Sequence, residues 1–193
     1  MSFYEECIKV VNDELNNFEF GIVKNIALSS EENEHNILNF TGKKKLPNYT
    51  QVFIREYTDI YEATIIVRTD QLSYLKNKFP EYYQHEIERF NVFLKSINLE
   101  LTEETYFLIS LLHEFGHMDY YDCLYKYAKT VPTGKILDNT FNNLLNLTFN
   151  FPTLKEKVGR IRIIHKFHPE EIYADKFAYE RFLPIWNKVK HLV

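Results

Sequence analysis

A long apolar segment with histidines and a glutamate at its centre constrains this chain more than any other feature. Residues 102–128 contain no proline and one glycine, and the stretch 106–112 is apolar on nearly every side. Thr102 is suited to cap a helix, and Glu103 and Glu104 would then lie in its first turn, where the helix dipole favours negative charge. A helix that is apolar all round is a buried helix. The sequence therefore predicts a central, buried helix over residues 102–128.

This predicted helix carries the pentapeptide His113-Glu114-Phe115-Gly116-His117. Positions i and i+4 of a helix lie on the same face, so the two imidazoles could bind one Zn²⁺ through their ring nitrogens. Glu114 would lie next to the first ligand, close enough to act as general base on a metal-bound water. The alternative is a chance match, in which both histidines are core residues with ordinary hydrogen-bond partners.

A third ligand must come from elsewhere, because catalytic zinc usually takes three protein ligands and keeps one position for water. The segment 168–179 predicts a helix with Glu171 and Asp175 on one face, together with Ala174 and Ala178. Small residues would let this helix approach the central one closely. We therefore predict Glu171 as the third ligand. Asp175 would accept a hydrogen bond from the second ring nitrogen of a ligand histidine.

Other polar residues nearby compete for these roles. His165 and His168 are alternative ligands, although each is better explained as a substrate-pocket or surface histidine. Glu170 is expected to be only a first-turn acid that the helix dipole favours. Asp119 and Asp122 follow the pentapeptide, but the helix would have to distort to bring either carboxylate to the metal.

Residues 171–175, Glu-Ile-Tyr-Ala-Asp, resemble the second motif of gluzincin metallopeptidases, Glu-x-x-Ala-Asp. The longer run to residue 184 is similar to the ImmA/IrrE-type family of cytoplasmic peptidases, which phages and mobile elements often encode. The resemblance covers about residues 100–184. It implies that His113, His117 and Glu171 bind zinc, that Glu114 is the catalytic base and that Asp175 supports a ligand.

The same resemblance implies a fold and an activity. The expected fold is α+β and zincin-like, with a small, mainly antiparallel sheet packed on the central helix and further helices toward the C-terminus. Residues 1–193 would form one metallopeptidase domain. The segment between His117 and Glu171, residues 118–170, is longer than the family leads us to expect. Residues 131–166 are therefore predicted to be an inserted helical lobe. The expected activity is zinc-dependent endopeptidase cleavage of an intracellular protein, such as a repressor or partner from the same genetic element.

The remaining chain predicts short helices and strands. Helices are expected over residues 3–18, from Pro80 onward, over 135–149 and 154–166, and from 168 to about 184. Strands are expected over 20–28, 51–57 and 60–68. Residues 61–68 are also the candidate sheet edge on which a substrate would lie, although the same run would serve equally as an interior strand. The donor that stabilises the oxyanion is left open between Tyr173, Tyr179, His165 and His168.

Composition narrows the class of protein. A net charge of −4 argues against a nucleic-acid partner. Cys7 and Cys123 have no zinc-ribbon or redox spacing. The acidic N-terminus lacks the apolar region of a signal peptide, and no apolar run reaches membrane-spanning length, so we expect a cytoplasmic protein without a membrane partner. Two alternatives to an enzyme stay open: a non-catalytic zincin-fold binding or regulatory module, and a structural zinc protein with a fourth protein ligand.

Overall fold

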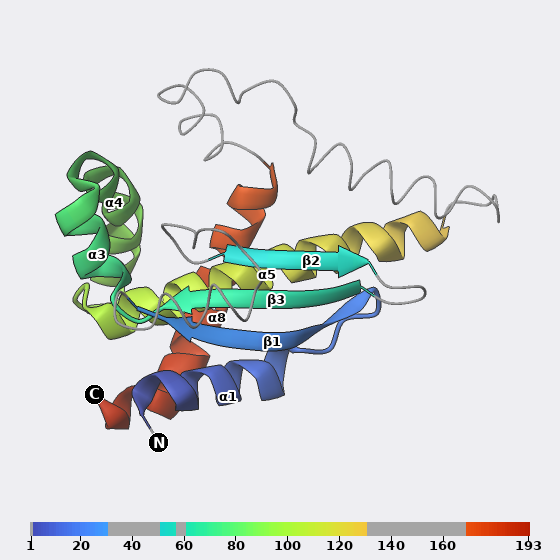
Figure 1. The fold of residues 1–193 in the computed structure, drawn as a ribbon, viewed down its shortest axis with the longest axis horizontal. Coiled ribbons are helices and arrows are strands. Elements are labelled where there is room, and N and C mark those ends of the chain that lie inside the picture. The colour runs from blue at the N-terminus through green and yellow to red at the C-terminus, as the bar shows by residue number, and fades with distance from the viewer. Residues whose placement is uncertain (1, 31–50, 57–60, 131–168) are drawn as a thin grey trace.

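A computed structural model describes residues 2–30, 51–56, 61–130 and 169–193 of the chain (Figure 1). Its elements, in chain order, are α1 (Phe3–Leu15), β1 (Gly21–Ser29), β2 (Gln51–Glu56), β3 (Tyr61–Arg68), α3 (Gln71–Lys78), α4 (Pro80–Ser96), α5 (Glu103–Thr130), α8 (Pro169–Val189) and the 3-10 turn η1 (Lys190–Leu192). The predicted combination of helices with a small sheet is therefore present. No described helix combines the length and the apolarity that crossing a membrane requires.

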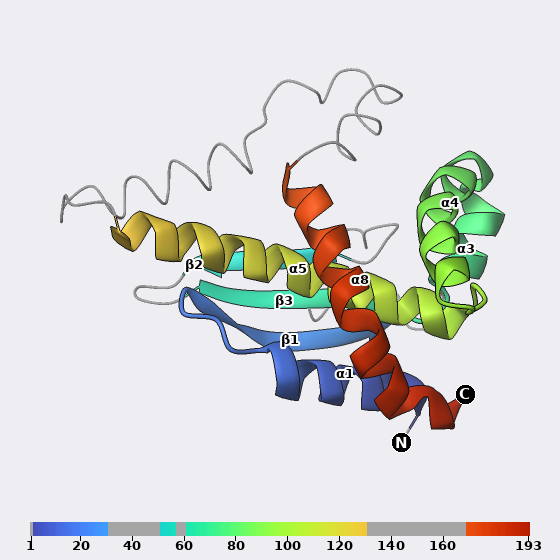
Figure 2. The ribbon, with the colours of Figure 1, turned by 180° about the vertical axis from the view of Figure 1, so that it is seen from behind.

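The helix α5 is the predicted central helix, and it begins and ends within two residues of the expected bounds. The hydroxyl of Thr102 accepts a hydrogen bond from the backbone N–H of Thr105, 3.3 Å away, which caps the first turn. The apolar stretch before the pentapeptide is buried, including Phe107, Leu108 and Leu111. The sheet and α8 both pack on this helix (Figure 2).

The sheet has three strands in the order β1-β3-β2, and the predicted strands match to within one residue. The expectation of a mainly antiparallel sheet is wrong, because β1 pairs with β3 in parallel and only β2 pairs with β3 antiparallel. The separation of β1 from β3 along the chain, from Ser29 to Tyr61, gives the length that a parallel pairing requires. Sequence-adjacent strands therefore pair as a hairpin at β2–β3 but not at β1–β2.

The strand β3 lies in the middle of the sheet, so the prediction that residues 61–68 form the substrate-binding edge is wrong. Ala63, Ile65, Ile66 and Val67 are all buried. Consecutive buried residues are typical of an interior strand covered on both faces, whereas a half-exposed edge strand would alternate. Within the described sheet, β1 and β2 are the two edges.

Helix α8 crosses α5 on the face of α5 that is turned away from the sheet (Figure 2). The two helices approach most closely where Gly116 meets Ala174, because a Cβ atom at Gly116 would lie 2.7 Å from the Cα of Ala174. Ala174 and Ala178 are fully buried. The predicted close approach along the alanine face of α8 is confirmed.

Two predicted helix ends differ from the structure. Helix α8 continues past Pro184, because the side chains of the following turns, Ile185, Trp186 and Val189, are buried and anchor it. Helix α1 ends at Leu15 rather than near residue 18. Asn16 instead pairs with β1: its amide donates to the carbonyl of Val23 at 2.8 Å and accepts from the N–H of Val23 at 2.9 Å. These two bonds tie Asn16 to β1, and α1 does not continue to residue 18.

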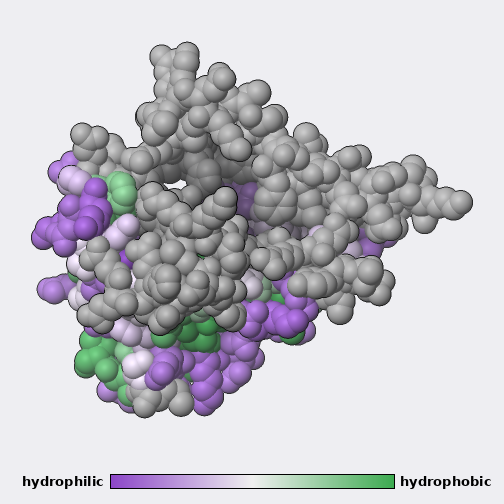
Figure 3. Space-filling view, viewed as in Figure 1, coloured by the Kyte–Doolittle hydropathy of each residue, from purple (hydrophilic) through white to green (hydrophobic). Residues whose placement is uncertain are grey.

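Helices α3 and α4 stand beside the N-terminal end of α5 (Figure 1). Sequence analysis did not predict α3, whose first turn receives its cap from another helix: the carboxylate of Glu103 accepts from the backbone N–H groups of Leu72 and Ser73. The surface that α3 and α4 present in Figure 3 is mostly hydrophilic. The predicted helices over 135–149 and 154–166, and the predicted lobe over 131–166, lie outside the described residues.

Candidate metal centre

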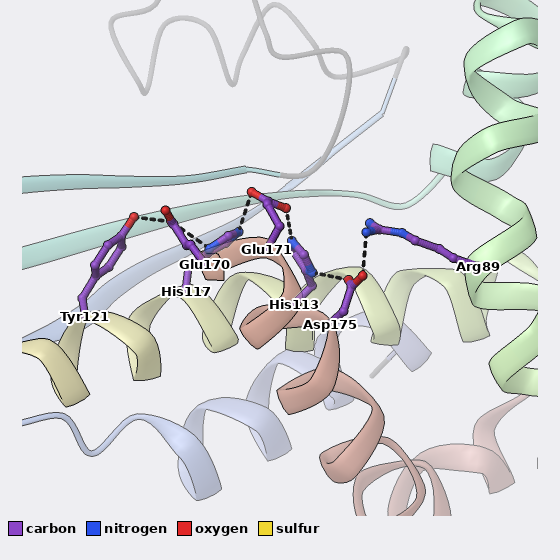
Figure 4. A network of polar contacts seen from close by, with 7 residues as sticks. All are labelled: Arg89, His113, His117, Tyr121, Glu170, Glu171 and Asp175. Atoms are coloured by element: carbon purple, nitrogen blue, oxygen red, sulfur yellow. Dashed lines mark hydrogen bonds and ion pairs between the residues drawn. The ribbon is translucent and has the colours of Figure 1, made fainter. Parts of the chain in front are cut away.

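The crossing of α5 and α8 brings His113, His117 and Glu171 together (Figure 4). One ligand atom from each side chain lies within 4.8 Å of the others. Nε2 of His113 is 3.2 Å from Oε2 of Glu171, and Nε2 of His117 is 3.7 Å from Oε1 of the same carboxylate. Both Nε2 atoms therefore face one carboxylate, which is the arrangement that the sequence predicted.

These three side chains fit a zinc ion. Two ligand atoms that are each bonded to one tetrahedral zinc lie about 3.4 Å apart, given bonds of about 2.1 Å. The two distances from the histidine nitrogens to Glu171, 3.2 and 3.7 Å, bracket that value. Two imidazoles and one carboxylate are also a donor set that zinc accepts readily. His113, His117 and Glu171 would thus be the residues that hold the metal.

Asp175 lies where the sequence placed it, beside the first histidine. Nδ1 of His113 donates to Oδ1 of Asp175 at 2.8 Å, since a carboxylate can only accept. A proton fixed on Nδ1 leaves the lone pair of Nε2 free to point toward Glu171 and a metal. The other oxygen of Asp175, Oδ2, accepts from Nη1 of Arg89 at 2.7 Å.

Glu170 has a role that sequence analysis missed. Its Oε1 lies 2.9 Å from Nδ1 of His117 and also accepts a hydrogen bond from the hydroxyl of Tyr121 (Figure 4). The expectation that Glu170 is only a first-turn acid is therefore wrong. The available signal was Tyr121, which lies one helical turn after His117 and is 2% exposed. A buried phenol needs a hydrogen-bond partner, and Glu170 provides it.

The contact between His117 and Glu170 is less well aligned than that of His113. Among the residues that the structure describes, Nδ1 of His117 has no partner in hydrogen-bond geometry, although the 2.9 Å distance to Glu170 is that of an ion pair. Both histidines of α5 thus have a carboxylate of α8 at Nδ1.

Glu114, the predicted base, is 6% exposed on α5. Its negative charge contributes to raising the pKa of both His113 and Tyr121, which places its carboxylate in the same electrostatic environment. A carboxylate next to a ligand in a largely dry site is suited to take a proton from a nearby water.

Electrostatics in this cluster are dominated by carboxylates. Burial would lower the pKa of His113, but hydrogen bonds to Asp175 and Glu171 and the charges of Glu171 and Glu114 outweigh it and raise the pKa to about 10. Burial, followed by the charge of Glu170, raises the pKa of Tyr121, so its hydroxyl stays a donor. The cluster therefore attracts a cation, either a proton on His113 or a metal ion.

Several other predicted candidates are engaged elsewhere. The hydroxyl of Tyr173 donates to Asp119, so neither residue is directed at the metal centre. The ring of Tyr179 stacks on Phe93 of α4, with the ring centroids 4.2 Å apart. Asp122 accepts from the backbone N–H groups that precede β1 at 2.7 and 3.0 Å.

The two remaining predicted candidates, His165 and His168, lie outside the described residues.

Comparisons with known proteins give no further assignment. No family model matches the sequence, and neither a curated protein nor a solved structure matches it. The site described above therefore carries the functional argument.

Proposed function

We propose that this protein is a zinc-dependent endopeptidase of the gluzincin type, with a zincin-like fold. The observation that supports the proposal most strongly is the convergence of His113, His117 and Glu171, whose ligand atoms lie within 4.8 Å of one another. Glu114 stands beside the first of them on the same helix. This combination of two histidines, a distant carboxylate and an adjacent base is what metal-assisted peptide hydrolysis requires.

The chemistry divides between the metal and the chain. Zinc, when bound, supplies a water ligand of near-neutral pKa and polarises the substrate carbonyl. The carboxylate of Glu114 accepts the proton of the attacking water and delivers it to the leaving amine. Asp175 holds the proton on Nδ1 of His113, so that its Nε2 remains available as a ligand. Glu170 lies 2.9 Å from Nδ1 of His117 and would do the same for that ring once the two groups align.

The peptide substrate is proposed to bind along β2. Zincins of small size hold an extended substrate as an added strand on a sheet edge, which β3 cannot provide because it is central. Of the two edges of the described sheet, β2 makes the more extensive contact with α5, on which the proposed ligand histidines lie. Backbone hydrogen bonds to β2 would then align the scissile bond with the metal centre.

The proposed substrate is a protein of the cytoplasm. This part of the proposal is supported by the resemblance to the ImmA/IrrE-type family in residues 100–184. A repressor or partner from the same genetic element is the substrate class that the resemblance implies.

A comparison of wild type with Glu114→Gln tests the enzymatic reading. Both proteins are expected to hold the same amount of zinc, while cleavage falls by about 100-fold or more, the scale of general acid–base catalysis. New protein termini in cells that express each form would be counted by proteomics. Glu180→Gln is the matched control, because Glu180 is exposed on α8 and pairs only loosely with Lys176 at 3.8 Å. Full activity of zinc-loaded Glu114→Gln would contradict the proposal and favour a binding module.

A structural zinc centre is the remaining alternative. Such a centre would need a fourth protein ligand, whereas the group found among the described residues has three members. Three ligands leave a position for water, which supports an enzyme over a structural centre.

A further inference from the structure

Helix α4 packs against the same helix that carries the third ligand. Phe93 of α4 stacks on Tyr179 of α8 with the ring centroids 4.2 Å apart, and meets Phe182 edge-on at 5.6 Å. Phe90 adds an edge contact to Tyr179 at 6.3 Å. Tyr179 and Phe182 follow Asp175 along α8 at one and two helical turns, so the aromatic contacts fix α4 beside Asp175.

Arg89 lies at the end of this aromatic contact that is nearest the metal centre. Nη1 of Arg89 donates to Oδ2 of Asp175 at 2.7 Å, while Oδ1 of the same carboxylate accepts from Nδ1 of His113 at 2.8 Å (Figure 4). Each oxygen of Asp175 thus has its own donor. A carboxylate held at both oxygens cannot rotate without breaking one of these bonds.

We propose that Arg89 is a positioning residue of the metal centre, which acts through Asp175 to orient the ring of His113. The inference rests on the proposed zinc site and extends it to a third helix. Without the guanidinium, Asp175 would gain freedom to rotate away from His113, and the ring would lose the bond that presents Nε2 to the metal. The cation also balances a cluster that holds four carboxylates, Glu114, Glu170, Glu171 and Asp175.

The plain alternative is a surface ion pair that only helps α4 to pack. Exposed pairs contribute little to stability and have no reason to change metal binding. The side chains of Arg89 and Asp175 are 23% and 20% exposed, so the pair is partly desolvated and its bonds are charge-assisted on both sides. The two readings differ in one respect: only positioning makes zinc affinity depend on the contact between Arg89 and Asp175.

A double-mutant cycle on zinc affinity separates them. Arg89→Met keeps most of the aliphatic stem and removes the charge and the donors. In competition with a chelator, it is expected to weaken zinc binding by about threefold to tenfold, the range of coupling within one hydrogen-bond network. In an Asp175→Asn background the same substitution is expected to change affinity by less than about twofold. Equal effects in both backgrounds, or no effect in either, would overturn the proposal.

Two further variants keep the test decisive. Arg89→Lys keeps the charge but lacks the planar fork, and its zinc affinity is expected to fall between wild type and Arg89→Met. If Arg89→Met fails to fold, Arg89→Lys replaces it in the double-mutant cycle. Its effect on zinc affinity must then likewise vanish in the Asp175→Asn background. Arg181→Met is the control, because Arg181 lies over the ring of Phe177 at 5.6 Å, within α8, and the substitution should leave zinc affinity unchanged.

A spectroscopic signal gives an independent readout. In the zinc-loaded protein, the Nδ1 proton of His113 should give a resolved, slowly exchanging NMR resonance, and its exchange with water should be faster in Arg89→Met. An unchanged exchange rate would count against positioning. Failure of the wild type to bind zinc would instead refute the proposed function, and the inference with it, before any variant is compared.

Discussion

The two histidines of the proposed metal centre are supported in different ways. His113 is held by an aligned 2.8 Å bond to Asp175, which a cation from α4 holds in turn. His117 lies 2.9 Å from Glu170, without hydrogen-bond alignment, and Glu170 is held by Tyr121 of the same helix as His117. The contacts that support His113 involve three helices and end at the charged guanidinium of Arg89. Those beside His117 involve two helices and end at the neutral hydroxyl of Tyr121.

The difference shows how one helix organises the whole centre. Glu170 and Asp175 flank Glu171 along α8, so the ligand and both supporting carboxylates belong to one rigid element. The close approach at Gly116 and Ala174 sets the distance between this element and the histidines. The centre therefore depends on the crossing of α5 and α8 more than on any single contact.

Removing a proposed ligand should reduce zinc affinity more than any other change, whichever histidine is considered. Glu171→Ala or His117→Ala is expected to lower zinc affinity by more than about 100-fold, beyond the range for supporting residues, because each removes a direct bond to the metal. Elemental analysis after dialysis against a weak chelator measures the loss. Zinc retained at one ion per chain in either variant would show that the ligands are other residues.

Removing one supporting carboxylate should reveal the asymmetry. Asp175→Asn and Glu170→Gln are each expected to weaken zinc binding by about 10- to 100-fold while the protein still folds. The loss should be larger for Asp175→Asn, because its bond to the ring is better aligned. Chelator competition ranks the two variants. A larger loss for Glu170→Gln would mean that the contact to His117 is the stronger one once metal is bound.

The crossing itself can be widened with one methyl group. In Gly116→Ala, the new Cβ would meet the Cα of Ala174 at 2.7 Å and its carbonyl oxygen at 2.9 Å, so α8 must shift. Overpacking of this kind destabilises by about 1–3 kcal/mol, which exceeds the gain of up to about 1 kcal/mol from replacing glycine in a helix. Urea unfolding measures the net loss of stability. A more stable Gly116→Ala protein would show that the helices are less close than described.

How far the sequence predicts the centre depends on the range of the interaction. The positions of His113 and His117 follow from helix geometry alone, as does the shared face of Glu171 and Asp175. Glu170 was missed because a local explanation, the helix dipole, was sufficient for it, and its partners lie on another helix. Arg89 gave no signal, because only the packing of α4 on α8 brings it to Asp175.

In the fold, too, local patterns were predicted and contacts between distant elements were not. Helices and strands with clear periodicity were predicted to within a few residues, because their patterns are local. The order of the strands was not, since the parallel pairing of β1 with β3 depends on a crossover that periodicity does not encode. The uninterrupted aliphatic run at 65–67 was the sequence signal for an interior strand, and burial of all three residues bears it out.

The hydroxyl of Tyr121 should have a smaller effect than either carboxylate. Tyr121→Phe keeps the buried ring, which meets Phe20 edge-on at 6.2 Å, and removes only the donor to Glu170. Zinc binding is expected to weaken by about twofold to fivefold, within the range of coupling between members of one network. Isothermal titration of zinc into both proteins measures the change. An effect as large as that of Glu170→Gln would make Tyr121 the main support of His117.

The stability of the zinc-free protein should also change with pH. The pKa of His113 in the folded state is about 10, above the usual value of 6.5. The resulting contribution to stability is therefore complete below pH 6.5 and is lost as pH rises toward 10. Thermal melts of the zinc-free protein across this range should show a gradual decline that Asp175→Asn reduces. A rise in stability over the same interval would contradict a protonated His113.

The most direct test of the account is zinc K-edge X-ray absorption on the purified wild-type protein, with the metal content measured on the same sample. The account predicts about one zinc per chain, bound by two imidazole nitrogens, one carboxylate oxygen and one water. A chain that binds no zinc at chelator-buffered concentrations would contradict the metal centre. A shell closed by a fourth protein ligand would contradict a hydrolytic role.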